Sequence, residues 1–404
     1  MTKQKHAKEP LMHLTRRLNF SPKYAWAIRI GAFVLSILVC AIVTTILSPK
    51  ANVGFFFRYL FTGTFGTTRL IWALFRDLAI LLLLALAVTP CFKMRYWNIG
   101  GEGQALMGCL GAAVIVSQLY GKMATPLVLI IALVVAIGFG AVWAVIPALF
   151  KAKWNTNETL LTLMFNYIAG CLGAFFVKKA DPNTTGSLSF LDSIGNAGNI
   201  GSNQFILIII IATVITTLMA VYLKYSKHGY EITVVGESPN TARYVGIHNK
   251  KVIIRTLVLC GVLCGIVGFM MVCFKDHSFK AESATDTTVG GLGFTAVLIS
   301  WLAHFNPLAM VLTSFLVVFI TRGAKNVGDY ARLGANYPSM MVGIFFFFII
   351  ATEFFINFKI SFRQKGELPK EPDDLIKSSE ETADKTRAQS ADAAAATPAS
   401  ATEA

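Results

Sequence analysis

Long apolar segments separated by short polar ones repeat along most of this 404-residue chain. A run of about 18 apolar residues with few charges is long enough to cross a bilayer as a helix. Segments that meet or approach this length lie at 28–47, 70–92, 104–119, 126–150, 159–177, 205–223, 252–274, 308–321 and 338–358. We therefore expect an all-α, polytopic membrane bundle with about 8–10 transmembrane helices.

A shorter apolar stretch, 289–304, ends at Asn306-Pro307, so a broken or re-entrant segment is expected near 289–307. Such a break is tolerated at membrane depth only against protein or a cavity. Our best count is ten spans with both ends inside. That count puts the loop 322–337, with Arg322, Lys325 and Arg332, outside the cell. A re-entrant segment would instead put this loop inside and the C-terminus outside.

The remaining segments are polar. Residues 1–27 are expected to form a basic cytoplasmic leader, and 28–358 the transmembrane domain. Within that domain, 225–251 is a cytoplasmic loop, and 49–68 is expected at the outer interface. Residues 359–404 are charged and rich in Ala, Ser and Thr, which predicts a disordered cytoplasmic tail.

Composition supports a membrane protein. The chain is 55% hydrophobic and 14% charged, which excludes an ordinary soluble domain. Its net charge of +14 does not indicate nucleic acid, because the cations flank apolar spans as cytoplasmic loops do. The seven cysteines lie within or beside apolar segments and fit small buried residues better than disulfides or metal ligands.

Ionisable and amide side chains within the apolar segments are candidates for function. Glu102 lies in the run Asn98-Ile-Gly-Gly-Glu-Gly-Gln104, at the start of a predicted span. A carboxylate there is costly unless it is paired or hydrated, so this run either lines a pathway or caps the helix. For Arg76 and Asp77, near the start of another span, we expect snorkelling or mutual pairing more than a buried site.

A second polar run precedes the span 159–177. Asn157 or Thr156 can cap that helix, and Glu158 would sit in its first turn, where the helix dipole favours a carboxylate. Thr162 and Asn166 are four residues apart and share a face with Glu158. This polar stripe faces either an aqueous path or neighbouring helices through hydrogen bonds.

The most distinctive loop, 229–247, is polar and punctuated by glycines, and it joins two long spans. Its surrounding cations place it in the cytoplasm. Pro239 after Ser238 predicts a short helix capped by Ser238, and Gly246 would end that helix. Such a helix either receives motion from a cytoplasmic partner or is an ordinary amphipathic connector. A further run, 290–294, is glycine-rich and is expected to allow close helix packing.

The sequence lacks the common motifs of phosphate-binding, metal-binding and hydrolytic sites. There is no phosphate-binding Gly-x4-Gly-Lys-Ser/Thr loop, no His-Glu-x-x-His and no Gly-x-Ser-x-Gly, and the six histidines form no ligand pattern. We therefore expect no catalytic residue, no metal site and no bound cofactor in this chain.

Taken together and in chain order, the polar runs described above resemble those of the permease subunit of bacterial ABC importers. The similarity is greatest to the nucleoside and simple-sugar permeases, which are related to ribose and branched-chain amino acid permeases. It rests on 98–104, on the pattern from Asn157 to Ile168, and on the pattern from Gly236 to Ile247, where Thr241 replaces a usual Ala. It runs from about residue 70 to 358.

The resemblance implies a transport subunit of the bacterial cytoplasmic membrane. A separate ABC ATPase, which uses ATP and Mg²⁺, would dock on the 225–251 loop, and a second, homologous permease chain would complete the pore. A binding lipoprotein or periplasmic protein would deliver a nucleoside or a related small polar solute, such as a sugar, purine or riboflavin-like molecule. The coupling residues would be Gly229, Gly236, Glu237, Pro239, Arg243 and Gly246. The translocation pathway or its support would include Asn98, Glu102, Gln104, Asn157, Glu158, Thr162, Asn166 and Asn306.

The main alternative is a stand-alone secondary transporter. Such proteins often carry intramembrane charge relays and internal repeats, and here mid-span ionisable residues are sparse and no duplicated half is evident. An intramembrane enzyme is a weaker alternative, because no clustered nucleophile, acid–base pair or metal set appears within the spans.

Overall fold

The structure is a computed structural model that describes residues 12–16, 22–48, 51–181, 186–190, 194, 203–283 and 286–362. Over these residues the chain is mostly helical, and nine helices are long and apolar enough to cross a membrane. They are α1 (Pro22–Leu47), α3 (Thr68–Lys93), α4 (Gly101–Leu119), α5 (Thr125–Trp154), α6 (Glu158–Ala180), α8 (Ile206–Tyr225), α11 (Asn249–Met270), α13 (Pro307–Ala331) and α14 (Tyr337–Asn357). The predicted membrane bundle is confirmed.

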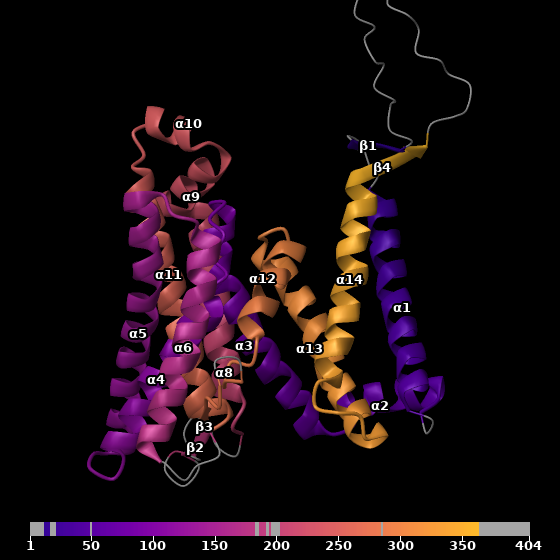
Figure 1. The fold of residues 1–404 in the computed structure, drawn as a ribbon, viewed down its shortest axis with the longest axis horizontal. Coiled ribbons are helices and arrows are strands. Elements are labelled where there is room, and N and C mark those ends of the chain that lie inside the picture. Colours follow the sequence, from indigo (N-terminus) through magenta and orange to yellow (C-terminus); the bar gives the residue numbers. More distant parts are fainter. Residues whose placement is uncertain are drawn as a thin grey trace, which may run out of the picture. The chain divides into compact units, whose positions relative to one another are not determined.

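Short elements join the long helices. They are α2 (Val53–Phe65), α9 (Lys227–Glu237), α10 (Pro239–Tyr244), α12 (Leu292–Leu302) and a π-helical turn that continues α11 (Met271–Lys275). Two short strands, β2 (Ser187–Ser189) and β3 (Ser278–Lys280), pair antiparallel. Figure 1 shows α9 and α10 at one end of the α5 and α11 pair, and β2 and β3 at the other end.

The helices α3, α4 and α11 are the buried centre of their group. In their most apolar windows 67%, 72% and 78% of residues are buried, against 22% for α5. Glycines allow these backbones to approach closely: a Cβ on Gly108 of α4 would lie 2.8 Å from the Cα of Gly265 on α11. A Cβ on Gly261 of α11 would lie 2.4 Å from the carbonyl oxygen of Gly140 on α5. Small residues at such contacts let membrane helices associate by van der Waals packing.

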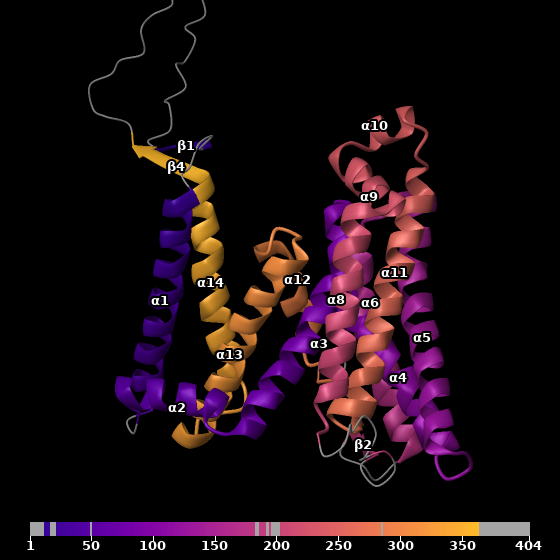
Figure 2. The ribbon, with the colours of Figure 1, turned by 180° about the vertical axis from the view of Figure 1, so that it is seen from behind.

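The contacts of α3 link this group to the remaining helices. It packs against α8, which lies beside it in Figure 2, and also against α12 and α13. On α13, a Cβ at Gly323 would lie 2.4 Å from a methyl carbon of Leu60 on α2, and Asn326 donates a 2.7 Å hydrogen bond to the carbonyl oxygen of Tyr59. The predicted interfacial segment 49–68 therefore contains a helix that packs on α13.

The broken segment is real, but its bounds differ from expectation. The helix α12 has 11 residues, about 16 Å at 1.5 Å per residue, which is too short to span a bilayer. In the described residues, the expected ten spans are therefore nine long helices and this short one. The loop predicted at 322–337 is wrong, because α13 continues to Ala331 and only five residues separate it from α14.

The described ends of the chain pair with each other. Strand β1 (Met12–Arg16) runs antiparallel to β4 (Phe358–Phe362), with Met12 opposite Phe362. Because β1 precedes α1 and β4 follows α14, the start of α1 and the end of α14 lie near each other. The sequence did not predict these strands. Residues 1–11, 17–21 and 363–404 of the expected leader and tail lie outside the described residues, and the disordered tail stays a prediction.

Candidate functional site

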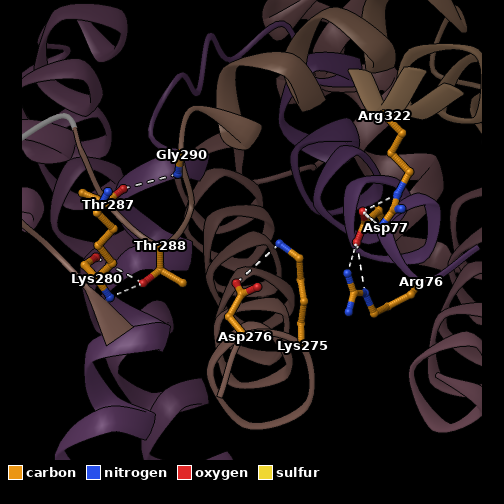
Figure 3. Close-up of polar contacts among 9 residues, drawn as sticks. All are labelled: Arg76, Asp77, Lys275, Asp276, Lys280, Thr287, Thr288, Gly290 and Arg322. Carbon is orange, nitrogen blue, oxygen red and sulfur yellow. Dashed lines mark hydrogen bonds and ion pairs between the residues drawn. The ribbon is translucent and has the colours of Figure 1, made fainter. Parts of the chain in front are cut away.

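A cluster of charges lies between α3 and α13. Asp77 on α3 accepts hydrogen bonds from Nε of Arg76 at 3.1 Å and from Nε of Arg322 at 2.8 Å, and a second nitrogen of Arg322 lies 2.7 Å from the carboxylate. Figure 3 shows the two guanidinium groups reaching Asp77 from different sides. The predicted Arg76–Asp77 pairing is confirmed. Arg322 was missed, because its position had been assigned to a loop.

The charged cluster opens onto a cavity of about 320 Å³. Its polar lining consists of the following side chains: Asp77, Lys275, Thr295, Thr321, Arg322 and Ser339. Apolar residues of α3, α12, α13 and α14 form the rest of the wall. A second cavity of about 440 Å³ shares Asp77, Lys275, Thr321 and Arg322 with the first. Binding sites for small molecules have this character, with mostly apolar walls and a few convergent polar groups.

Charges in this position are expensive. An ionisable side chain within a membrane segment is normally paired, or faces a cavity or a solute path. The side chains of Asp77, Arg76 and Arg322 are 24%, 16% and 18% exposed. The cluster is therefore mostly buried but still accessible. Lys275 adds a further cation near it, 3.4 Å from Asp276 (Figure 3). The arrangement offers both donors and an acceptor to a polar solute.

Most of the predicted pathway residues gather elsewhere, at the start of α4. The carboxylate of Glu102 is 7% exposed. Its two oxygens accept hydrogen bonds from the backbone N–H groups of Gly291 at 2.8 Å and Gly293 at 2.7 Å. Since Glu102 lies in the first turn of α4 and the two glycines begin α12, one carboxylate complements two helix N-termini. A Cβ on Gly293 would lie 2.4 Å from the nitrogen of Glu102, so this contact requires glycine.

Four other predicted residues fix the chain just before α4. Asn166 accepts a 2.9 Å bond from the N–H of Gly103 and donates a 3.1 Å bond to the carbonyl oxygen of Ile99. Thr162 accepts a 3.3 Å bond from the N–H of Ile99. Asn98 and Gln104 contact each other, and both contact the thiol of Cys260 on α11. We call Glu102 and these four residues the α4 hub.

The α4 hub does not line the cavity beside Asp77. Its polar groups are hydrogen-bonded to neighbouring helices and loops, so its geometry fits support of the pathway rather than contact with a solute. Asn157 caps α6 by accepting bonds from the N–H groups of Thr159 and Leu160, as predicted. Glu158 pairs with Lys151 at 2.7 Å. Asn306 caps α13 through the N–H of Leu308 at 3.0 Å.

The short helix predicted between two spans is present as α10. Ser238 caps it by accepting a 3.2 Å bond from the N–H of Thr241, and Gly246 follows its end with a φ of +82°. Both features were predicted from the sequence and are confirmed. Arg243 and Glu237 are exposed, and Tyr244 at the end of α10 is 93% exposed.

Two glycines allow α9, the helix that precedes α10, to pack closely against the ends of two membrane helices. A Cβ on Gly236 would lie 2.2 Å from the carbonyl oxygen of Lys93, and a Cβ on Gly229 would lie 2.7 Å from the carbonyl oxygen of Leu223. The chain therefore presses α9 directly against the ends of α3 and α8. Movement of α9 would be transmitted to both membrane helices.

The chain matches known transport proteins over most of its length. Residues 70–351 match the family described as the permease component of branched-chain amino acid transport systems, and the chain belongs to this family of membrane permeases. It is 28% identical to the glucose ABC transporter permease TsgB13 of Haloferax volcanii, over 85% of this chain and 93% of that protein.

Two permeases of Lactococcus lactis also match. The nucleoside ABC transporter permease NupB is 27% identical over 74% of this chain and 83% of its own length. The second protein, the nucleoside ABC transporter permease NupC, is 23% identical over 67% of this chain and 86% of its own length. The predicted family is thus confirmed. The chain is the permease component of an ABC importer, a non-catalytic membrane subunit that works with an ATPase.

Family membership also decides between the alternatives that the sequence left open. A stand-alone secondary transporter is set aside. Asp77, Arg76 and Arg322 nevertheless form a charged cluster beside the cavity, on helices that are long and apolar enough to cross a membrane. One sequence signal was available for this cluster: an acid on one predicted span and a base at the end of another are complementary charges.

Proposed function

We propose that this permease imports a nucleoside or a related small polar solute, and that the solute passes the cavity beside Asp77. The observation that carries the proposal is this charged, hydroxyl-lined cavity within apolar helices. The hydroxyl groups of a sugar or ribose both donate and accept hydrogen bonds. Asp77 supplies the acceptor, while Arg322, Lys275 and the hydroxyls of Thr295, Thr321 and Ser339 supply donors. The similarity to the nucleoside permease NupB and the glucose permease TsgB13 supports this solute class.

The proposed partners follow from the family and the geometry. A cytoplasmic ATPase, which binds the ATP and Mg²⁺, would contact α9 and α10, where Glu237, Pro239 and Arg243 are exposed. Force applied there would reach α3 and α8 through Gly236 and Gly229. NupB and NupC, two permeases of one organism, support pairing with a second homologous chain. A binding lipoprotein or periplasmic protein would deliver the solute.

The orientation in the bacterial cytoplasmic membrane is part of the same proposal. The helix ends beside α9 and α10 carry an excess of cations, as cytoplasmic ends do. They are Lys93, Arg95, Lys151, Lys153, Lys224, Lys227, Arg243, Lys250, Lys251 and Arg255. We therefore place α9 and α10 in the cytoplasm.

Uptake by cells that lack the native gene tests this proposal. Complemented cells would be given labelled uridine, guanosine, ribose and glucose, each alone and in competition. We expect uptake of at least one nucleoside or sugar, reduced tenfold or more by Asp77→Asn and by Arg322→Gln, because each change removes an ion pair between α3 and α13 and unbalances the enclosed charges. The control is Arg58→Gln, an exposed arginine of α2 outside the cavity. Full uptake by both cavity variants would refute the proposed path.

A further inference from the structure

A third cavity lies at the end of α3 that is far from Asp77. It encloses about 650 Å³ between the α3–α4 loop, the end of α5, α10 and the start of α11. Four cations line it: Arg95, Lys151, Arg243 and Lys250. We call this cavity the basic pocket. Neither the proposed solute path nor the α4 hub uses it, and Gly236, Pro239 and Arg243 of its lining belong to the segment proposed to couple to the ATPase.

The charges of the basic pocket are unbalanced. Glu158 is the carboxylate in its lining, and Lys151 already pairs with it at 2.7 Å. Among the described residues, no carboxylate lies within ion-pair distance of Arg95, Arg243 or Lys250. Like charges that face one space repel each other and raise the local concentration of anions. This arrangement therefore favours an anionic ligand from outside the chain.

The free donors of the basic pocket suit a phosphate group. Arg95, Arg243 and Lys250 line the pocket and are exposed, so their guanidinium and ammonium groups are accessible to a ligand. Charged donors of this kind make strong hydrogen bonds to phosphate oxygens.

The position of the basic pocket indicates where the phosphate comes from. Two of its lining residues, Lys151 and Asn155, lie at the end of α5, the helix with only 22% of its apolar window buried. Trp154 in the same turn is 59% exposed and stacks on Phe150 with 5.1 Å between ring centroids. Exposed tryptophans at the ends of lipid-facing helices lie at the level of the lipid headgroups. The pocket is therefore beside the membrane interface.

We propose that the basic pocket binds the phosphate headgroup of an anionic phospholipid, such as phosphatidylglycerol. Basic pockets between membrane helices on the cytoplasmic side bind such headgroups. Arg243 belongs to α10, whereas Lys151 and Lys250 belong to the membrane helices α5 and α11. A bound headgroup therefore joins α10 to the bilayer-embedded part of the protein. Anionic lipid would hold α10 in place and so regulate transport, whatever the solute is.

Lipid binding can be measured by native mass spectrometry on the chain, purified with the subunits that accompany it. Phosphatidylglycerol would be titrated against phosphatidylcholine. We expect preferential retention of phosphatidylglycerol. Since each basic residue near an anionic lipid surface contributes roughly a fivefold gain in binding, the double variant Arg95→Gln, Lys250→Gln should bind it roughly 25-fold more weakly.

Lys251→Gln is the matched control. Lys251 is the sequence neighbour of Lys250, carries the same charge and is exposed, but it lines a different cavity. Its lipid binding should equal that of the unmodified protein. Arg95 and Lys250 are exposed, so the thermal midpoint of the double variant should stay unchanged, which separates lost binding from lost folding.

Three results would overturn the proposal. Equal retention of the two lipids would show that no anion is selected. Displacement of phosphatidylglycerol by millimolar inorganic phosphate would show a site for free phosphate. Protection of Arg95 and Lys250 from chemical modification by the bound ATPase, with no effect of lipid, would assign the basic pocket to an acidic surface of that partner. Failure of solute uptake would leave the lipid measurement unaffected, so the two proposals can fail separately.

Discussion

Two of the carboxylates in the membrane helices, Glu102 and Asp77, are neutralised in different ways. Glu102 accepts hydrogen bonds from the backbone N–H groups of Gly291 and Gly293, at the junction of two helix N-termini. Asp77 is held by the side chains of Arg76 and Arg322 and lines a cavity. The first carboxylate is held by rigid backbone, the second by long side chains that can change partner.

This difference separates two roles. Backbone donors at a helix start cannot move without unfolding that helix, so Glu102 joins α4 to α12 as part of the fold. Arginine side chains rotate at little cost, so the partners of Asp77 can rearrange around a polar solute. Asp77, whose counter-charges are side chains beside a cavity, is therefore a better candidate than Glu102 for contact with a solute.

The largest expected effect is on folding, at Glu102. The substitution Glu102→Ala leaves two buried N–H groups without acceptors, which should lower the free energy of unfolding by about 3 kcal/mol or more. Glu102→Gln retains one acceptor oxygen and should lose less. Thermal unfolding in detergent measures both. An unchanged midpoint for Glu102→Ala would break the comparison, because Glu102 would then be no more structural than Asp77.

A smaller effect is expected at the glycine that faces Glu102. The Cβ of Gly293→Ala would lie 2.4 Å from the backbone nitrogen of Glu102, so α12 must shift away from α4. Overpacking of this kind costs about 1–3 kcal/mol. Thermal unfolding is again the measurement. The control is Gly334→Ala, since no atom lies within 4 Å of a Cβ at Gly334. Equal thermal midpoints for the two variants would contradict this prediction, because they would show that the contact between α12 and α4 can accommodate a methyl group.

The smallest effect is expected on solute affinity, at the wall of the cavity. Thr295→Val keeps the shape of the side chain and removes its hydroxyl. If the solute accepts or donates one hydrogen bond there, the KM for uptake should rise about fivefold, the value of one bond near 1 kcal/mol. The thermal midpoint should stay the same. Thr217→Val, an exposed threonine of α8, is the control and should change neither quantity.

The sequence predicted local features well wherever a few adjacent residues determine the geometry. Ser238, Pro239 and Gly246 define the start and end of α10, and Asn157 caps α6, because these effects act within one helical turn. The polar run before α4 also stood out, since amides and an acid are unusual next to apolar spans.

Long-range contacts could not be predicted in this way. The segment after Thr321 contains Arg322, Lys325 and Asp329, and its polarity indicated a loop. It is helical because Asn326 bonds to the backbone of α2 and Arg322 to Asp77, partners more than 240 residues away. The function of the α4 hub was left open for the same reason: the pattern marks Glu102 as unusual, but only its partners show what neutralises it.

An exchange of the two charges beside the cavity tests the distinction most directly. In the double variant Asp77→Arg, Arg322→Asp the ion pair can re-form between α3 and α13, while the acceptor and donor groups trade places. Uptake and the thermal midpoint would be measured on the same preparation. We predict a midpoint closer to that of the unmodified protein than in either single variant, with uptake still reduced at least tenfold. Recovery of full uptake in the double variant would contradict this, because it would show that the pair serves the fold alone.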